Sequence, residues 1–434
     1  MKNVARYHAV MLAVVFLLAL VLRVGVTTLF VGLDSAPDAG ANPDQIDYEM
    51  LAYRMSVGLG YSLETGEPTA RRAPGTSLIL LPVYKLFGHS YAAGRLWFCL
   101  LSALTCVMVG WLGRACFGPV TGLVAAGWLA VYPGHFYYTM HFVSETPYSF
   151  WLAGALALTI WATRTPFLLG HVAAGACWAM AVLTRPQIVL ALPMMLGVVL
   201  LTGPKETRFV NLKRWAVQAC VVVVLVSPWV VRNAVVLGKP TLVTISGLGF
   251  WGSNNELVLL DPDLRGGWVK HSRLSRELRP LPGGEVARDA AAWRYGLEFV
   301  KDHLAEMPGL VTAKLRRLVW PFSDTPNLAV RWAFALGWMA LAPFLLVGVV
   351  QGVRRAAGPA MVLALPVMAT VATVVIYYGS DRFRDSCAPA LLVFASLGLV
   401  DVTGLALRWR ATRGLPAGII QTSPADEHAV ASVS

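Results

Sequence analysis

The stretch that decides the class of this protein is "HAVMLAVVFLLALVLRVGVTTLFVGL", residues 8–33. A bilayer-spanning helix needs about 20 mainly apolar residues, so this run is long enough to cross a membrane. The preceding "MKNVARYH" is basic, as at the start of a signal peptide, but the apolar run is too long for a cleaved signal. The following "VGLDSAPDAG" is also a poor cleavage site. We therefore expect a retained signal anchor.

Similar apolar runs recur along the chain, in which 56% of the 434 residues are hydrophobic and only 14% are charged. Soluble domains carry about 25% charged residues. The sequence therefore predicts an all-α integral membrane protein with about ten transmembrane helices and short helices on its outer face. After the first span, the expected spans lie near 92–113, 119–138, 146–163, 167–183, 187–203, 214–231, 331–352, 358–378 and 387–408. The apolar run at 74–88 is too short to span and is expected at the interface.

Basic residues in the short loops predict the orientation, because Lys and Arg concentrate on the cytoplasmic side. These loops are "GRACFG", "TRTP", "GPKETRFVNLKR", "QGVRRAAG" and "RWRATRG". Placing them inside leaves both termini cytoplasmic, in a cell (inner) membrane, and puts the acidic segments 34–91 and 232–330 outside. Anchoring beside anionic lipid explains the net charge of +12. The sequence has no nucleic-acid-binding motif, and we expect membrane lipids rather than nucleic acid as partners.

The chain divides into four predicted regions. A membrane region at 1–233 carries the first outer loop, 34–91, and an outer-face region at 234–330 contains the helical stretch 286–304. C-terminal transmembrane helices occupy 331–410. The tail at 411–434 is expected to be cytoplasmic and disordered, because most of it is small and polar. The six cysteines show no CxxC pairing, so the sequence indicates neither a zinc site nor a disulfide framework.

The first outer loop contains "PDQIDYEMLAYRM", residues 43–55, which begins with a proline suited to a helix start. Asp44 and Asp47 are three residues apart and would share one face of a short helix. They could be simple caps of a solvated helix or members of a functional site. The loop closes with the basic pair Arg71 and Arg72.

Other outer loops add charged and polar groups close to the predicted membrane surface. Glu145 stands where a span begins and could cap that helix, although a carboxylate at membrane depth is costly without a partner or a function. The remaining candidates are Arg185, Arg232, Asn255, Arg382 and Arg384. Each arginine alone could be a snorkelling interfacial anchor. Together, arginines at several outer ends opposite acidic residues suggest an anionic ligand held beside a carboxylate.

Arginine pairs suit phosphate because they form bidentate charge-assisted hydrogen bonds. A neighbouring carboxylate can accept a proton from an attacking hydroxyl, and two carboxylates can hold a divalent ion. A polyprenyl-phosphate sugar combines a lipid tail, a phosphate and a transferable group. A transporter or flippase of a lipid-linked anion could use the same arginines. Transporters, however, more often place charges near mid-membrane in related halves, which this sequence does not show.

The chain also resembles the GT-C class of integral-membrane glycosyltransferases. The similarity is greatest to the branch with the family 39 protein O-mannosyltransferases and the lipid A aminoarabinose transferase. Matching segments include "DQIDYEMLAYRMSVGLGYS", "ARRAPG", "AVYPGHFYYTMHFVSETPY", "AVLTRPQ" and "SDRFRDSCAPALLVFASLGL". Their order and spacing are specific for the class, not for the substrate.

The resemblance implies roles for particular residues. The family's catalytic aspartate corresponds best to Asp44, with Asp47 as the rival. Glu145 matches the acidic residue that helps to hold a metal or orient the donor, and Arg72 matches a basic residue facing the donor phosphate. The chain departs from the family pattern at Gln45 and Arg71, where relatives often carry Glu.

Together these observations predict a glycosyltransferase that moves a hexose or pentose from an undecaprenyl-phosphate donor. The acceptor would be a protein, lipid or glycan on the outer face, attacking with inversion at the sugar's anomeric carbon. Asp44 is the expected base, with Arg72 and Arg71 and either Arg382 or Arg384 at the phosphate. Glu145, Arg185, Arg232 and Asn255 are expected to bind substrate. Asp44 and Glu145 are the candidate ligands for a divalent metal.

Overall fold

The computed structural model describes every residue except 1, 41, 166–167, 203–204, 326 and 414–434. The described residues form helices, turns and one isolated bridge, between Ser62 and Pro68, and no strand. The predicted all-α class is therefore confirmed. Most of the predicted C-terminal tail lies outside the described residues.

Ten helices or helix limbs match the ten predicted spans. They are α1 (Lys2–Phe30), α4 (Tyr91–Phe117), α5 (Pro119–Val131), α7 (Glu145–Thr163), α8 (Leu168–Thr184), η2 with α9 (Pro186–Leu190 and Ala191–Thr202), α10 (Lys205–Leu237), the two limbs of α16 (Leu328–Ile376) and α18 (Ala388–Arg413). By length and composition, four helices of the described chain could cross a membrane: α1 from Arg6, α4, α10 and α16. Several of the others are shorter apolar helices.

The long helix α16 is two limbs joined at Ala356, whose backbone is not helical (φ −154°, ψ 68°). Both ends of α16 lie near the outer-face helices. Near its start, the Trp338 indole donates to the carbonyl of Val319, and at its end the Asn254 amide donates to the carbonyl of Ile376. The chain therefore reverses at Ala356, in the basic segment predicted as a loop between two spans.

One predicted span is wrong in its second half. The span expected over 119–138 ends at Val131, and α6 (Pro133–Phe136) and η1 (Tyr137–Met140) follow. Proline at 133 cannot continue the hydrogen-bond ladder of α5. The Arg23 guanidinium, only 1% exposed, donates to the carbonyls of Leu129 and Ala130 at the end of α5. Arg23 of α1 therefore replaces the backbone N–H groups that would have donated to these carbonyls if α5 had continued.

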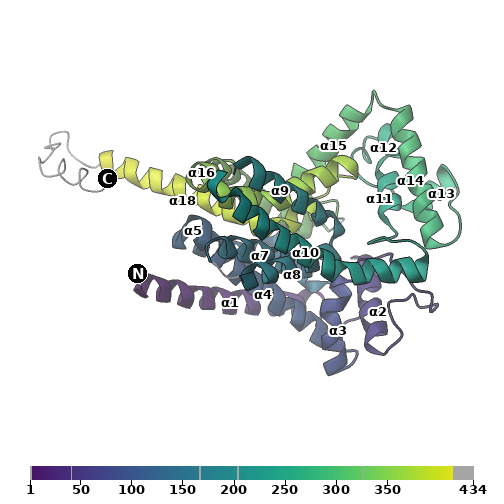
Figure 1. Ribbon diagram of the computed structural model, residues 1–434, viewed down its shortest axis with the longest axis horizontal. Coiled ribbons are helices and arrows are strands. Elements are labelled where there is room, and N and C mark those ends of the chain that lie inside the picture. The colour runs from purple at the N-terminus through teal and green to yellow at the C-terminus, as the bar shows by residue number, and fades with distance from the viewer. Residues whose placement is uncertain (1, 41, 166–167, 203–204, 326, 414–434) are drawn as a thin grey trace, which may run out of the picture.

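The remaining helices gather at one end of the bundle (Figure 1). They are α2 (Asp44–Ser56), α3 (Gly75–Phe87), α11 (Ser246–Ser253), α12 (Glu256–Leu260), α13 (His271–Glu277), α14 (Glu285–Asp302), α15 (Met307–Val319) and α17 (Asp381–Ser386). The short apolar run at 74–88 forms α3, and the predicted helical stretch 286–304 forms α14. The start of α1 and the C-terminal end of α18 both lie at the opposite end of the bundle (Figure 1), as an even number of crossings would require.

Candidate active site

The segment bearing Arg71 and Arg72 is held against the bundle where α3 begins. A Cβ on Gly75 would lie 2.7 Å from the carbonyl carbon of Leu183, so only glycine lets α3 approach the end of α8 this closely. This approach places Arg72 near Arg185, which follows α8 directly. The Tyr61 hydroxyl fixes the same segment by donating to the carbonyl of Arg72 at 3.0 Å.

Two further residues anchor this segment from other parts of the chain. Arg232, near the end of α10, donates to the carbonyls of Thr69 and Tyr61, each at 2.7 Å. Glu285, at the start of α14, accepts from the Thr69 hydroxyl at 2.6 Å and from the Ala70 amide at 2.8 Å. Sequence reasoning missed Glu285, because a glutamate in the first turn of a helix looks like an ordinary cap.

Arg72 joins the two aspartates of α2. Its Nη2 donates to Asp44 Oδ1 at 2.7 Å and its Nε donates to Asp47 Oδ2 at 2.8 Å. The shared helix face predicted for the two aspartates is therefore confirmed. Arg71 is more distant, with its Nε 3.8 Å from Asp47 Oδ2. The two ion pairs hold Arg72 in place, and part of the Asp44 side chain remains exposed to solvent.

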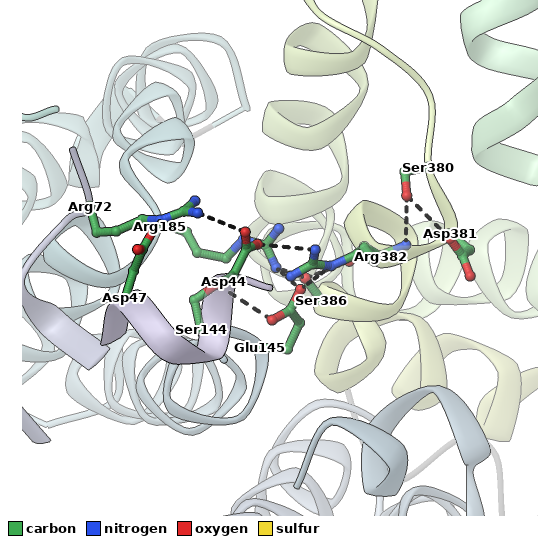
Figure 2. A network of polar contacts seen from close by, with 10 residues as sticks. All are labelled: Asp44, Asp47, Arg72, Ser144, Glu145, Arg185, Ser380, Asp381, Arg382 and Ser386. Atoms are coloured by element: carbon green, nitrogen blue, oxygen red, sulfur yellow. Dashed lines mark hydrogen bonds and ion pairs between the residues drawn. The ribbon is translucent and has the colours of Figure 1, made fainter. Parts of the chain in front are cut away.

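Arg382 of α17 connects α2 with the start of α7. Its Nη1 lies 3.2 Å from Asp44 Oδ2 and its Nε donates to Glu145 Oε1 at 2.7 Å. Arg185 Nη1 lies 3.3 Å from the same glutamate oxygen and also donates to the Ser386 hydroxyl. Figure 2 shows these side chains converging from four separate parts of the chain. Three arginines and three carboxylates therefore form one network that leads from Asp47 to Glu145.

The network sets the charge of its members. Burial alone would raise the pKa of Asp44, but the Arg72 and Arg382 guanidiniums outweigh it and hold the pKa below its usual range. Burial acts to lower the pKa of Arg382, whereas the carboxylates of Glu145 and Asp44 raise it well above its usual value. Asp44 is thus ionised and Arg382 is charged at neutral pH.

A cavity of about 660 Å³ opens at this network. Its polar end is lined by Asp44, Arg71, Arg72, Arg185 and Arg382. Its apolar wall includes Val189, Leu190, Leu242, Val243, Ile245 and Ile376. The cavity combines a cationic end with a hydrophobic wall, which is the combination that an amphiphile with an anionic headgroup requires.

Some predicted site residues lie elsewhere. Arg384 is buried, pairs with Asp385 at 3.1 Å and donates to the carbonyl of Trp320, so it does not line the cavity. Arg232 does not line the cavity either; it holds the segment that carries Arg72 through the carbonyls of Thr69 and Tyr61. Asn255 is fully buried and caps α12 by accepting from the Val258 amide at 3.1 Å.

The candidate metal ligands do not fit a divalent ion well. The Arg382 guanidinium is bonded to both Asp44 and Glu145, so a cationic group already links the two carboxylates. In the described part of the chain, no three His, Cys, Asp or Glu residues form a group that could hold a metal. Hard divalent cations prefer several oxygen ligands, which this pair does not supply.

Comparisons with known proteins agree with this architecture. Residues 71–231 match the family model described as dolichyl-phosphate-mannose-protein mannosyltransferase. A search of curated proteins found no match. The chain is similar to the archaeal oligosaccharyltransferase AglB from Archaeoglobus fulgidus, solved with an inhibitory peptide and a dolichol-phosphate. The TM-score is 0.55 and the identity 14%, over 96% of this chain and 53% of that chain.

Two other solved structures are also similar. The Archaeoglobus fulgidus oligosaccharyltransferase tethered to an acceptor peptide gives a TM-score of 0.56 and 17% identity, over 94% of this chain and 51% of that chain. ArnT from Cupriavidus metallidurans bound to undecaprenyl phosphate gives a TM-score of 0.42 and 17% identity, over 92% and 81% of the two chains.

The matches show the fold. The chain resembles the GT-C class of integral-membrane glycosyltransferases, as the sequence predicts. It spans about half the length of the solved oligosaccharyltransferases that it matches. The family match includes Arg72, Glu145 and Arg185 of the network and ends before Arg382.

Proposed function

We propose that this protein is a GT-C-type glycosyltransferase that moves a sugar from a polyprenyl-phosphate donor to an acceptor at one face of the membrane. The observation that carries the proposal is the cavity in which Arg72, Arg185 and Arg382 meet an apolar wall beside Asp44. Guanidinium groups bind phosphate by charge-assisted hydrogen bonds, and the apolar wall accommodates a prenyl chain. The family match and the oligosaccharyltransferase fold support the same chemistry.

The proposed reaction begins with an exchange of partners. The donor phosphate binds Arg72 and Arg382 and replaces the carboxylate oxygens of Asp44 on these guanidiniums. Asp44 is then free to accept the proton of the acceptor hydroxyl. The acceptor oxygen attacks the anomeric carbon from the face opposite the phosphate. As the new carbon–oxygen bond forms, the bond to the phosphate oxygen breaks and its electron pair remains on the polyprenyl phosphate.

Asp44 is preferred to Asp47 as the base because of its position. Asp44 lines the cavity, whereas Asp47 does not and is bonded to the Nε of Arg72. Glu145, only 3% exposed on its side chain, holds Arg382 and Arg185 in place. We assign Glu145 a positioning role toward the two arginines.

We infer that the cavity faces away from the cytoplasm and that both termini are cytoplasmic, in a cell (inner) membrane. The start of α1 and the C-terminal end of α18 lie at the end of the bundle opposite the site (Figure 1). The chain also reverses at Ala356, within a predicted basic loop, away from the outer-face helices that contact both ends of α16. Membrane-impermeant labelling of Glu64→Cys and Gly283→Cys tests this inference, in a background without the exposed Cys220. Both introduced thiols should label in intact cells. Labelling only after permeabilisation would contradict the orientation.

Lipid analysis of the purified protein tests the proposed donor. Mass spectrometry of co-purifying lipids should detect a polyprenyl phosphate or its sugar ester in wild-type protein and much less in Arg72→Ala. Transfer of the sugar to a second molecule separates an enzyme from a transporter of a lipid-linked anion. Movement of the intact donor between leaflets, without release of polyprenyl phosphate, would favour the transporter.

A further inference from the structure

A second cavity, of about 430 Å³, adjoins the candidate active site. Its walls come from the turn at 262–265, from α15 and the segment 320–324 that follows it, from the start of α16 and from residues 379–381. Ser380 lines both this cavity and the one described above. The segment 379–382 therefore separates the two cavities. We call the second one the arginine–aromatic cavity.

The arginine–aromatic cavity presents cations beside aromatic rings. The Arg316 guanidinium lies 5.2 Å from the centre of the Trp320 ring, and that of Arg331 lies 5.6 Å from the centre of the Phe322 ring. Within the described residues, neither guanidinium forms an ion pair with a carboxylate. Arg317 differs, because its Nη1 is paired with Asp324 at 3.0 Å. Arg316 and Arg331 thus remain available to an anionic ligand.

An unpaired carboxylate oxygen is the second feature of this cavity. Asp381 is only 8% exposed, and its Oδ1 accepts from the Ser380 hydroxyl at 3.1 Å. Its Oδ2 is buried without a hydrogen-bond partner among the described residues. Leaving a buried polar atom unpaired is costly, so such an atom calls for a ligand or a water molecule. Figure 2 shows Asp381 pointing away from the network that its neighbour Arg382 joins.

We propose that the arginine–aromatic cavity binds the acceptor and that this acceptor is an anionic saccharide; this inference rests on the proposed function. A phosphate or carboxylate on the sugar would pair with Arg316 and Arg331. The apolar face of the sugar ring would pack against Trp320 and Phe322. A sugar hydroxyl would donate to Asp381 Oδ2, which accepts but cannot donate when ionised.

The same geometry argues against a peptide as the acceptor. One common mode of peptide recognition adds an extended strand to the edge of a sheet. The described residues contain no strand, and this cavity offers one buried unpaired acceptor oxygen together with two aromatic rings. A saccharide acceptor held here would lie on the other side of the segment 379–382 from Asp44.

Binding of small probes to the full-length protein tests the proposal. Equilibrium dialysis would use glucose 6-phosphate and glucuronic acid, with glucose and the peptide acetyl-Glu-Ser-Glu-amide as comparisons. Nanodiscs carrying a diacylglycerol with a 6-phosphoglucosyl headgroup, or the same lipid without phosphate, test whether the saccharide is lipid-linked. Binding of the free sugars indicates a soluble acceptor. Retention of only the phosphorylated lipid indicates a membrane-bound one.

The double variant Arg316→Ala/Arg331→Ala should weaken binding of the anionic saccharide at least about tenfold, since charge-assisted hydrogen bonds are the strong ones. Asp381→Leu should weaken it by a smaller factor. Arg294→Ala, which removes an exposed arginine of α14, should leave binding unchanged. Undecaprenyl phosphate should bind all of these variants like wild type, which shows that they are folded.

Three results would overturn the proposal: no anionic saccharide binds the wild type, the double variant binds as well as wild type, or glucose or the peptide binds equally well. Failure of the wild type to bind undecaprenyl phosphate would instead contradict the proposed function. The two hypotheses can therefore fail separately.

Discussion

Arg382 and Arg384 lie two residues apart in the same short helix but occupy two different environments. Arg382 links Asp44 and Glu145 at the cavity, with 33% of its side chain exposed. Arg384 is 3% exposed and pairs with Asp385, which has no exposed side-chain surface and accepts from the Tyr132 hydroxyl at 2.7 Å. A Cβ on Gly134 would lie 2.5 Å from the Asp385 carboxyl group, so glycine is needed for this packing.

The two carboxylate environments differ in the same way. Two guanidiniums lower the pKa of Asp44, whereas burial raises the pKa of Asp385 in spite of Arg384. A partly exposed ion pair can exchange its partner for a ligand without leaving a charge unsatisfied in the interior. A fully buried pair such as Arg384–Asp385 cannot exchange its partner in this way, because an unpaired charge in the interior is costly. Ion pairs of the same composition are therefore suited to binding at one position and to folding at the other.

The largest expected effect is a loss of stability when the buried Arg384–Asp385 pair is broken. Arg384→Ala should destabilise the protein by about 3–5 kcal/mol, because it leaves Asp385 buried without its partner. Thermal unfolding in detergent measures the loss. Arg384→Met/Asp385→Leu should recover most of it, since apolar residues can replace a buried pair. Arg382→Ala is the matched control, and it should unfold at nearly the wild-type temperature but lose donor binding. Equal destabilisation by Arg382→Ala and Arg384→Ala would contradict the distinction between a binding arginine and a structural one.

The next effect concerns donor affinity. Arg72→Ala should weaken binding of undecaprenyl phosphate by about 2–5 kcal/mol, the cost of losing a desolvated charge-assisted contact. Arg72→Lys should bind better than Arg72→Ala but worse than wild type, because lysine keeps the charge without the bidentate geometry. Native mass spectrometry of the lipid-bound fraction compares them. Arg71→Ala should weaken binding less than Arg72→Ala, because Arg71 lines the same cavity but is more exposed. Unchanged affinity in Arg72→Ala would remove Arg72 from the site.

A smaller effect separates the two aspartates. Asp44→Asn should lower turnover at least about 100-fold, the lower range for removal of a general base. Asp47→Asn should be milder, because Asp47 does not line the cavity. Turnover and donor affinity measured together make the distinction, since donor binding should persist in both variants. An inactive Asp47→Asn together with an active Asp44→Asn would instead identify Asp47, one helical turn away, as the base.

The smallest expected effect is on pH dependence. A carboxylate with a lowered pKa stays ionised until the pH falls below its ordinary value of 3.8, so Asp44 adds no titration step near neutrality. Its contribution to stability is likewise present above the unfolded value and is lost as the pH falls through the folded one. The kcat/KM for the donor reports the free enzyme, so it should change less than about twofold between about pH 5.5 and 7.5 through this group. A step near pH 6 in kcat/KM that disappears in Asp44→Asn would contradict the lowered pKa, whereas such a step in kcat alone would show that the donor phosphate raises the pKa of Asp44.

Sequence patterns alone predicted the membrane class, the ten apolar segments, the helix carrying Asp44 and Asp47, and the short helix at 75–87. These features follow from composition and helical spacing, which act locally. The sequence also selected Glu145, because a carboxylate at membrane depth is costly without a partner. It selected Arg72, Arg185 and Arg382 as arginines in outer segments that also carry acidic residues.

Which of these charges meet follows from the packing of the helices. Packing separated Arg382 from Arg384, placed Arg232 and Glu285 against the Arg72 segment, and brought the buried Arg23 to the carbonyls left free where Pro133 ends α5. Each outcome depends on contacts between residues far apart in the chain, up to the 338 positions between Asp44 and Arg382. Local patterns cannot give the partner of a charge, because the free energy of an ion pair depends on burial and on the groups that packing brings beside it.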